Sequence, residues 1–185
     1  DLHALHQSEK EFELFLVFAH EVMDPYGRLL CFINRNQVNE QDPEPRPLTY
    51  NERLLKLGKV IPYFIWPNIN PFRKQKNIVD AVPQPGTANT ISNEEGTLRR
   101  AREWAQNARQ RQIGIYDATN PLQLEPFEVR FLARRRPPTR WVIDLSKNDN
   151  ILIQPQQYYR VYREDRLFIP PEYVSLFQEA GWKQG

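Results

Sequence analysis

Two apolar runs separated by a short turn sequence stand near the start of the chain. The first, residues 12–19, is apolar apart from Glu13, and the second spans residues 29–33 within a predicted strand over 28–34. Between them lies Asp24-Pro25-Tyr26-Gly27, where proline suits the second position of a tight turn and glycine the fourth. The pattern predicts a β-hairpin whose returning strand begins with Arg28. A permanently charged, fork-shaped phosphate binder would then have a fixed place on a rigid scaffold.

Helical patterns are clearest in three later segments. A helix is predicted from Thr49, because Glu52 completes a capping box, to Gly58, which is placed to end it. In residues 98–112, apolar side chains recur at spacings of three and four, and arginines fill a face that we expect to be solvated. A short C-terminal helix is predicted over residues 172–180, where two prolines open it and a glycine ends it.

Strand-like alternation marks much of the remaining second half. Residues 127–131 and 141–145 alternate with period two and predict a hairpin, whose connection is Arg134-Arg135-Arg136-Pro137-Pro138. Residues 151–153 and 158–162 predict further strands.

Prolines interrupt the middle of the chain. Residues 60–66 form an apolar run, but Pro62 argues against a central strand. Residues 68–96 are polar with repeated proline and glycine, which predicts a long surface loop with a short helix over 72–79 as an option.

Composition sets broad limits. The 185 residues are 40% hydrophobic, which is enough to form a core. The formal charge of +2 does not by itself indicate a nucleic-acid partner. The single cysteine, Cys31, excludes an internal disulfide and a cysteine-based zinc site. No run of about 18 apolar residues predicts a membrane span. No signal peptide is visible in a chain that begins at Asp1, and the localisation is unknown.

The order of these elements resembles the staphylococcal nuclease (thermonuclease-like) family. The matching segments are the turn motif 24–30, then Asn51-Glu52-Arg53-Leu54-Leu55 with Gly58-Lys59-Val60, then Pro67-Asn68, and finally residues 98–105 with Ile113-Gly114-Ile115-Tyr116. The resemblance covers roughly residues 12–116, with an insertion at about 69–97. It implies an α+β, mainly β fold: an OB-like five-stranded barrel with packed helices. The expected domains are 1–119, incomplete at its N-terminus, and 120–185, a small α+β extension made of a β-hairpin and a helix.

The resemblance also implies an activity, calcium-assisted hydrolysis of phosphodiester bonds in DNA or RNA, with Ca²⁺ as cofactor and nucleic acid as partner. Arg28 stands at one of the family's two catalytic arginines, where it would neutralise charge growing on phosphate oxygens. Tyr26 flanks that site. Tyr63 lies near a family tyrosine that packs against the bound nucleotide, with a register that Pro62 disturbs. Family members are often secreted.

The chain departs from the family in its acidic residues. The family's metal-binding carboxylates and general base precede the matched part, and none of the acids ahead of the turn stands in the family's settings: Asp1, Glu9, Glu11, Glu13 and Glu21. No metal ligand is assigned, and activity of this chain alone is uncertain. Three explanations stay open: the first strands lie outside the chain, strands from the 127–162 region complete the barrel, or the module is a non-catalytic relative.

A binding module is the competing class of function. An OB-like domain of this kind would hold nucleic acid or a protein partner without chemistry. Arg134, Arg135 and Arg136 would follow a nucleic-acid backbone in either class, or form a merely solvated loop. Arg28 could have a structural role instead of binding phosphate, through an ion pair with Asp24 or Glu21. Substrate preference and oligomeric state are not indicated.

Overall fold

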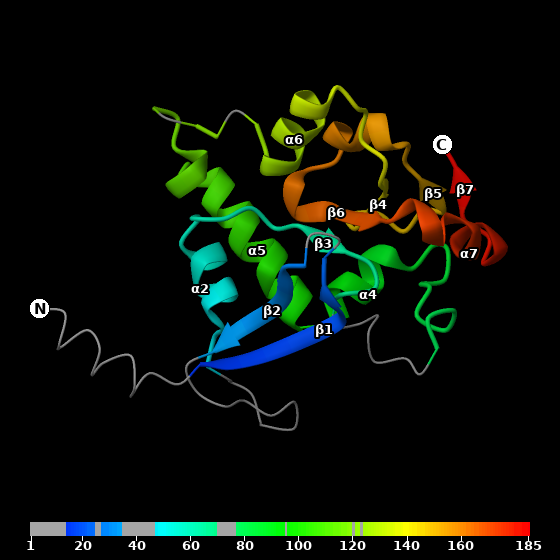
Figure 1. Ribbon diagram of the computed structural model, residues 1–185, viewed down its shortest axis with the longest axis horizontal. Helices are drawn as coiled ribbons and strands as arrows, with labels where there is room; N and C mark the ends of the chain where they lie inside the picture. The colour runs from blue at the N-terminus through cyan, green and yellow to red at the C-terminus, as the bar shows by residue number, and fades with distance from the viewer. Residues whose placement is uncertain are drawn as a thin grey trace, which may run out of the picture. The chain divides into compact units, whose positions relative to one another are not determined.

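The computed structural model describes residues 14–24, 27–34, 47–69, 77–94, 96–119, 121–122 and 124–185. The chain divides into two compact units, residues 1–54 and 55–185. Helices and open sheets both occur, so the predicted α+β class is confirmed, whereas the described residues form more helix than strand and are not mainly β (Figure 1). Within the described ranges, no helix is both long and apolar enough to cross a membrane.

The first unit is built on the predicted hairpin. β1 (Phe15–Met23) pairs antiparallel with β2 (Leu29–Asn34), and the register places Phe18 opposite Cys31. The pairing becomes irregular between Phe18 and Met23, which lies opposite Leu29. The hairpin is therefore confirmed, with a break in its ladder on the turn side.

The helix that follows begins with the capping box that the sequence predicts. In α2 (Tyr50–Lys56), the Glu52 N–H donates to Thr49 Oγ1 at 3.1 Å, and the Thr49 N–H donates to Glu52 Oε2 at 2.8 Å. The Ile33 N–H donates to Asn51 Oδ1 at 3.0 Å. This last bond ties β2 to the start of α2.

A three-stranded sheet lies at the centre of the second unit. Its order is β3 (Phe64–Ile65), β6 (Arg166–Ile169) and β4 (Trp141–Asp144), with β3 parallel and β4 antiparallel to β6. The strand after Pro62 is thus a short edge strand, which confirms that it is not central. A smaller parallel pair is formed by β5 (Ile151–Leu152) and β7 (Lys183–Gln184).

Helical segments surround these sheets in the second unit. They are α4 (Ala88–Glu94), α5 (Gly96–Gln110), η1 (Gly114–Tyr116), α6 (Pro126–Arg134), η2 (Pro155–Arg160), η3 (Arg163–Asp165), η4 (Pro171–Tyr173) and α7 (Val174–Glu179). The predicted helices over 98–112 and 172–180 correspond to α5 and to η4 with α7, so both are confirmed.

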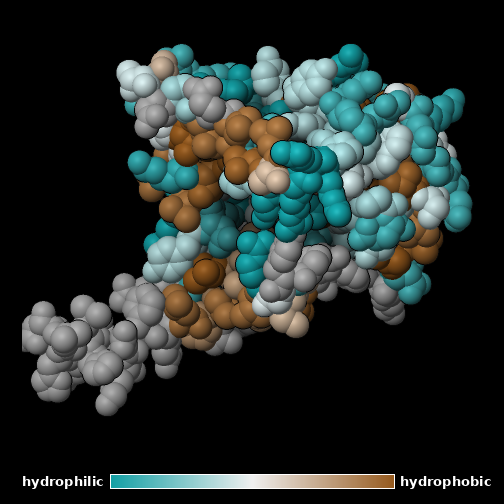
Figure 2. All heavy atoms as spheres, turned by 45° about the horizontal axis from the view of Figure 1, so that its top comes forward, coloured by the Kyte–Doolittle hydropathy of each residue, from teal (hydrophilic) through white to brown (hydrophobic). Residues whose placement is uncertain are grey.

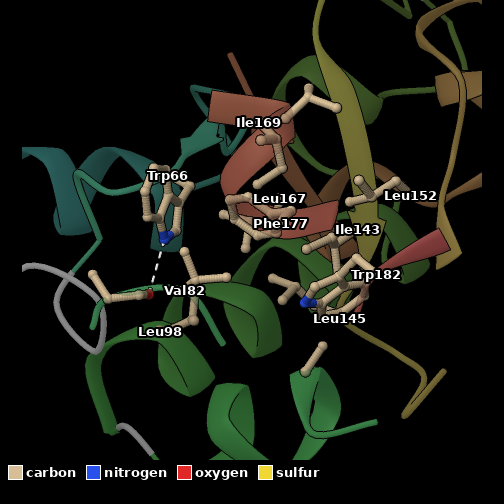
Figure 3. Close-up of a cluster of buried hydrophobic side chains, with 13 residues drawn as sticks. Trp66, Val82, Leu98, Ile143, Leu145, Leu152, Leu167, Ile169, Phe177 and Trp182 are labelled. Carbon is tan, nitrogen blue, oxygen red and sulfur yellow. Dashed lines mark hydrogen bonds between the residues drawn. The ribbon is translucent and has the colours of Figure 1, made fainter. Parts of the chain in front are cut away.

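The main core of the second unit gathers side chains from β3, β4, β6 and the flanking helices (Figure 3). Trp66, Leu167 and Phe177 are fully buried. The Trp66 and Phe177 rings pack edge-on, with their centroids 5.0 Å apart. The Trp66 indole N–H donates to the Ala81 carbonyl at 3.0 Å. Burying each large side chain of this kind stabilises the fold by about 1.5–3 kcal/mol.

Two glycines meet where α2 ends and η1 begins. Gly58 has φ +64° and Gly114 has φ +61°. The Ile115 N–H donates to the Gly58 carbonyl oxygen at 2.8 Å, and a Cβ on Gly114 would lie 1.9 Å from that oxygen. The two backbone segments approach at a distance that only glycine permits.

The strand predicted over 127–131 is wrong, because this segment is helix α6. Glu125 and Glu128 form a reciprocal capping box and Pro126 occupies the first helical turn, a combination that starts helices. Phe127 and Phe131 are four residues apart, which suits one helix face as well as one strand face. The partner of β4 is β6, not this segment, so the predicted 127–145 hairpin does not form.

Two further sequence-based expectations need correction. Residues 158–162 form no strand, because η2 begins at Pro155 and continues to Arg160. The segment 68–96 is more than a surface loop, because it contains α4 and several buried side chains: Ala81, Val82, Ala88 and Ser92. The short helix expected over 72–79 falls mostly outside the described residues.

The OB-like five-stranded barrel is not confirmed. Strands among the described residues form separate sheets of two, three and two strands, and none of these sheets closes. The division into domains 1–119 and 120–185 stays a prediction.

Candidate functional site

Arg28 lies where the hairpin turn meets β2. The Gly27 N–H donates to the Asp24 carbonyl at 3.0 Å, and the Asp24 N–H donates to the Arg28 carbonyl at 2.9 Å. Gly27 has φ +78°, a left-handed conformation in which glycine is favoured. These bonds fix the backbone of Arg28 relative to both strands, as the sequence predicts.

A carboxylate holds one edge of the Arg28 guanidinium. Asp24 Oδ2 accepts from Nε at 2.6 Å and contacts the terminal nitrogen NH2 at 2.5 Å, while Oδ1 accepts from the Arg28 backbone N–H at 3.0 Å. The Asp24 side chain is 11% exposed and the Arg28 side chain 62%. The Arg28–Asp24 ion pair, which the sequence leaves open as an alternative to phosphate binding, is therefore present. It orients the guanidinium and offsets part of its charge.

Among the residues that the structure describes, no set of calcium ligands lies beside this arginine. Within the described ranges, no group of three or more His, Cys, Asp or Glu side chains could hold a metal ion. The carboxylate next to Arg28, that of Asp24, is already engaged by the guanidinium. The described residues therefore do not fit a calcium site. Tyr26 and the side chain of Glu21 lie outside the described part of the chain.

Tyr63 belongs to the second unit, directly before β3. Its ring centroid lies 5.4 Å from that of Phe127 and 4.6 Å from that of Phe168. Its hydroxyl accepts a hydrogen bond from the terminal nitrogen NH1 of Arg140 at 2.9 Å. Burial raises the pKa of the Tyr63 phenol above its ordinary value. Tyr63 thus positions Arg140, and its predicted contact with a nucleotide stays a prediction.

The basic cluster lies at the C-terminal end of α6 rather than at a hairpin tip. Arg134 is the last helical residue, and Arg135 follows in a left-handed conformation at φ +50° and ψ +42°. Arg134, Arg135 and Arg136 are all exposed. Cations at the end of a helix interact favourably with its dipole. These three residues and Tyr63 belong to the second unit, whereas Arg28 belongs to the first.

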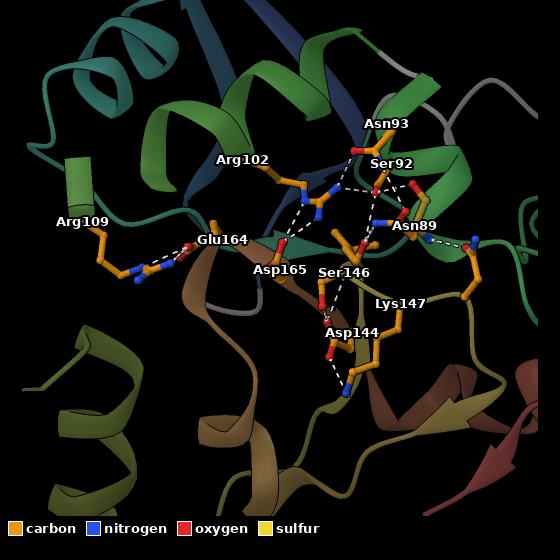
Figure 4. Close-up of polar contacts among 12 residues, drawn as sticks. Asn89, Ser92, Asn93, Arg102, Arg109, Asp144, Ser146, Lys147, Glu164 and Asp165 are labelled. Atoms are coloured by element: carbon orange, nitrogen blue, oxygen red, sulfur yellow. Dashed lines mark hydrogen bonds and ion pairs between the residues drawn. The ribbon is translucent and has the colours of Figure 1, made fainter. Parts of the chain in front are cut away.

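The arginine face of α5 is more than solvated surface. Arg102 donates from Nε and from NH2 to Asp165 Oδ1 at 3.0 and 2.7 Å (Figure 4). Arg109 donates in the same way to Glu164 Oε1, at 3.0 and 2.6 Å. Glu164 is buried, and its Oε2 has no hydrogen-bond partner among the described residues.

A buried carboxylate, that of Glu125, belongs to a similar set of ion pairs. Glu125 Oε1 accepts from Arg163 Nε at 2.9 Å and from Arg166 NH1 at 2.7 Å. Sequence reasoning missed these pairs, because the Arg102–Asp165 partners stand 63 residues apart and no local pattern joins them. The available signal was the run Arg163-Glu164-Asp165-Arg166, whose charges cannot all be buried unless each has a partner.

These arrangements support two kinds of chemistry. Arg28 presents an oriented guanidinium, suited to binding a phosphate or another oxyanion. The network around Glu125, Glu164 and Asp165 has its cations and carboxylates directed at one another, which is typical of structural ion pairs.

Comparison with known proteins gives one informative match. Over 164 residues the chain is 27% identical to endonuclease YhcR of Bacillus subtilis (strain 168). This alignment covers 89% of the chain but 10% of that protein, so the chain spans about a tenth of the length of the relative that it matches. No protein-family model and no solved structure match. The chain is thus distantly similar to a nuclease over most of its length.

Proposed function

We propose that this chain is the nucleic-acid-contacting part of a nuclease that hydrolyses phosphodiester bonds, with Arg28 as a catalytic phosphate ligand. The observation that carries the proposal is the likeness to an endonuclease over 89% of the chain. The likeness extends well beyond the hairpin, so it does not depend on the turn motif alone. The OB-like barrel implied by the family resemblance belongs to the same proposal, with β1 and β2 as two of its strands.

The chemistry assigned to Arg28 is electrostatic. Negative charge grows on the phosphate oxygens as a nucleophile attacks, and a guanidinium stabilises that charge more strongly in the transition state than in the ground state. Asp24 holds the Nε edge, so the arginine does not have to be ordered when substrate arrives. Removing one such donor typically costs about 10²–10³ in rate.

Calcium is part of the proposal only through the family resemblance. When bound, a calcium ion would supply Lewis acid stabilisation of the phosphate. The described residues offer no ligand set for it, so no step is assigned to it here. Adding and withdrawing calcium is therefore one arm of the experiment.

The experiment measures cleavage of DNA and RNA by the full-length gene product, with calcium and with a chelator. An Arg28→Ala variant should lose about 10²–10³ in kcat, and Arg28→Lys should recover little because lysine lacks the fork geometry. Arg53→Ala, an exposed arginine of the same unit, is the matched control and should cleave normally. Unchanged cleavage by Arg28→Ala would refute the assigned role.

A non-catalytic binding module is the second candidate. The observation that favours it is the lack of a metal-binding acidic group among the described residues. This candidate predicts oligonucleotide binding with no cleavage under any calcium concentration. Calcium-dependent cleavage that disappears in Arg28→Ala would exclude it.

A further inference from the structure

A dense run of arginines begins on the outer side of α6. Residues 129–143 contain five arginines and no aspartate or glutamate. These five side chains, which we call the arginine ridge, are Arg130, Arg134, Arg135, Arg136 and Arg140. Arg130 and Arg134 are one turn apart and share a face of α6. Two prolines then stiffen the path to Arg140.

The ridge differs in its partners from three other arginines of the second unit. Arg102, Arg109 and Arg166 each bind a carboxylate. Among the described residues, no ion pair joins Arg130, Arg135 or Arg136 to a carboxylate, and these side chains are exposed.

The acids nearest in sequence are committed elsewhere. Glu125 binds Arg163 and Arg166, and Glu128 accepts a hydrogen bond from the Tyr158 hydroxyl. Arg102, Arg109 and Arg166 are therefore neutralised within the unit, whereas Arg130, Arg135 and Arg136 form no ion pair with a carboxylate among the described residues. Adjacent like charges repel one another, and an anionic partner would relieve that repulsion.

An aromatic hollow adjoins the ridge. A shallow pocket of about 190 Å³ is lined by Tyr63, Glu125, Phe127 and Arg130, among others. Glu125 is engaged by Arg163 and Arg166, and Arg140 donates a hydrogen bond to the hydroxyl of Tyr63. Cations beside an aromatic wall suit a polymer that carries both phosphates and flat bases, and this favours nucleic acid over an anionic membrane.

We propose that the arginine ridge binds the sugar-phosphate backbone of single-stranded nucleic acid. The choice of partner rests on the proposed function, but binding by the ridge does not require cleavage. Each arginine that neutralises a phosphate releases counterions, so binding weakens as salt rises, with a slope of about 0.7 per contact on a log–log plot.

The test uses fluorescence anisotropy of a short labelled single-stranded DNA in chelator, with salt varied from about 50 to 200 mM. The variant Arg130→Gln/Arg135→Gln/Arg136→Gln removes three exposed ridge charges. Its slope should be smaller than that of the unaltered protein by about 2, and its affinity at the low-salt end should fall about tenfold or more.

The matched control removes three exposed charges outside the ridge: Arg99→Ala/Arg111→Ala/Lys183→Ala. Both triple variants change the net charge equally, so a slope retained by the control and lost by the ridge variant supports the proposal. Equal losses in the two variants, no DNA binding by the unaltered protein, or binding only to phosphatidylserine vesicles would overturn it.

Failure of this inference differs from failure of the proposed function. If the ridge variant binds DNA like the unaltered protein while Arg28→Ala stops cleavage, DNA binding by the ridge is refuted and the proposed nuclease activity is supported. If the ridge variant loses binding and no cleavage occurs under any condition, the ridge stands without the nuclease.

Discussion

The two compact units bury their apolar residues to different extents. In the hairpin, Met23 and Leu29 face each other with 59% and 54% of their surfaces exposed. Figure 2 shows hydrophobic atoms at the surface in more than one place, low in the view and again toward its upper left. In the second unit, Trp66 and Phe177 are fully buried. An isolated two-stranded hairpin is marginally stable in water. The proposed phosphate ligand thus lies on a hairpin whose paired apolar residues Met23 and Leu29 stay exposed.

The largest expected effect follows directly from this contrast. Phe177→Ala should lower the free energy of unfolding by about 3–5 kcal/mol, because it opens a cavity in the buried core. Leu29→Ala should change the same quantity by about 0.5 kcal/mol or less, since its side chain is already exposed. Urea unfolding followed by circular dichroism measures both. Equal losses would show that the hairpin contributes as much burial as the core does.

A second difference lies in the cost of an unpaired charge. Arg109→Met should lower the free energy of unfolding by about 2 kcal/mol, because it leaves the buried Glu164 carboxylate without its cation. Arg109→Met/Glu164→Leu should recover most of that loss, since no unpaired buried charge then remains at this position. Arg99→Met is the control, because its pair with Glu103 is exposed and long, at 3.8 Å. If the double variant is no more stable than Arg109→Met, the buried charge is not the cause.

Alkaline pH should act on the second unit. Burial raises the pKa of the phenols of Tyr63, Tyr116 and Tyr158 above the ordinary value of 10.0. A raised folded-state pKa means that folded protein retains protons that unfolded protein has lost. The contribution of these phenols to stability should therefore be constant below about pH 10 and fall as pH rises further. Melting temperatures should decline less steeply in Tyr63→Phe, and an unchanged decline would remove Tyr63 from the cause.

The smallest expected effect concerns the hairpin corner. Asp24→Asn should lower the free energy of unfolding by less than about 1 kcal/mol, because the Arg28 side chain is mostly exposed and solvent screens the pair. The change should instead be local, with faster hydrogen exchange at the Gly27 and Arg28 backbone N–H groups. A global loss larger than that of Arg109→Met would contradict the contrast between the units.

Local patterns account for the parts of the fold that the sequence predicts. The turn at Gly27, the Thr49–Glu52 capping box and the apolar stripe of α5 each depend on residues within a few positions of one another. Local patterns do not settle the structure of residues 127–131, because two phenylalanines four positions apart fit both a helix and a strand. The capping box at Glu125 favours the helix that the structure shows.

Long-range partners account for what the sequence does not reveal. The pairing of β4 with β6 and the Arg102–Asp165 ion pair join residues with no shared local pattern. In the candidate site, the place of Arg28 and its Asp24 partner follow from the turn sequence. The bond from Arg140 to the Tyr63 hydroxyl joins residues 77 positions apart and depends on the packed fold.

The close backbone approach of Gly58 and Gly114 limits which substitutions this protein can accept at these two positions. Each glycine is required twice, by its left-handed torsion and by the backbone that faces it, so a side chain at either position is opposed by two independent costs. A randomised library selected for folding should therefore return glycine at both positions. Gly27 has the same sign of φ but nothing within 4 Å of its missing Cβ, so asparagine should be recovered there. Glycine is thus required strictly at positions 58 and 114, where backbone atoms face it, and less strictly at position 27, where nothing does.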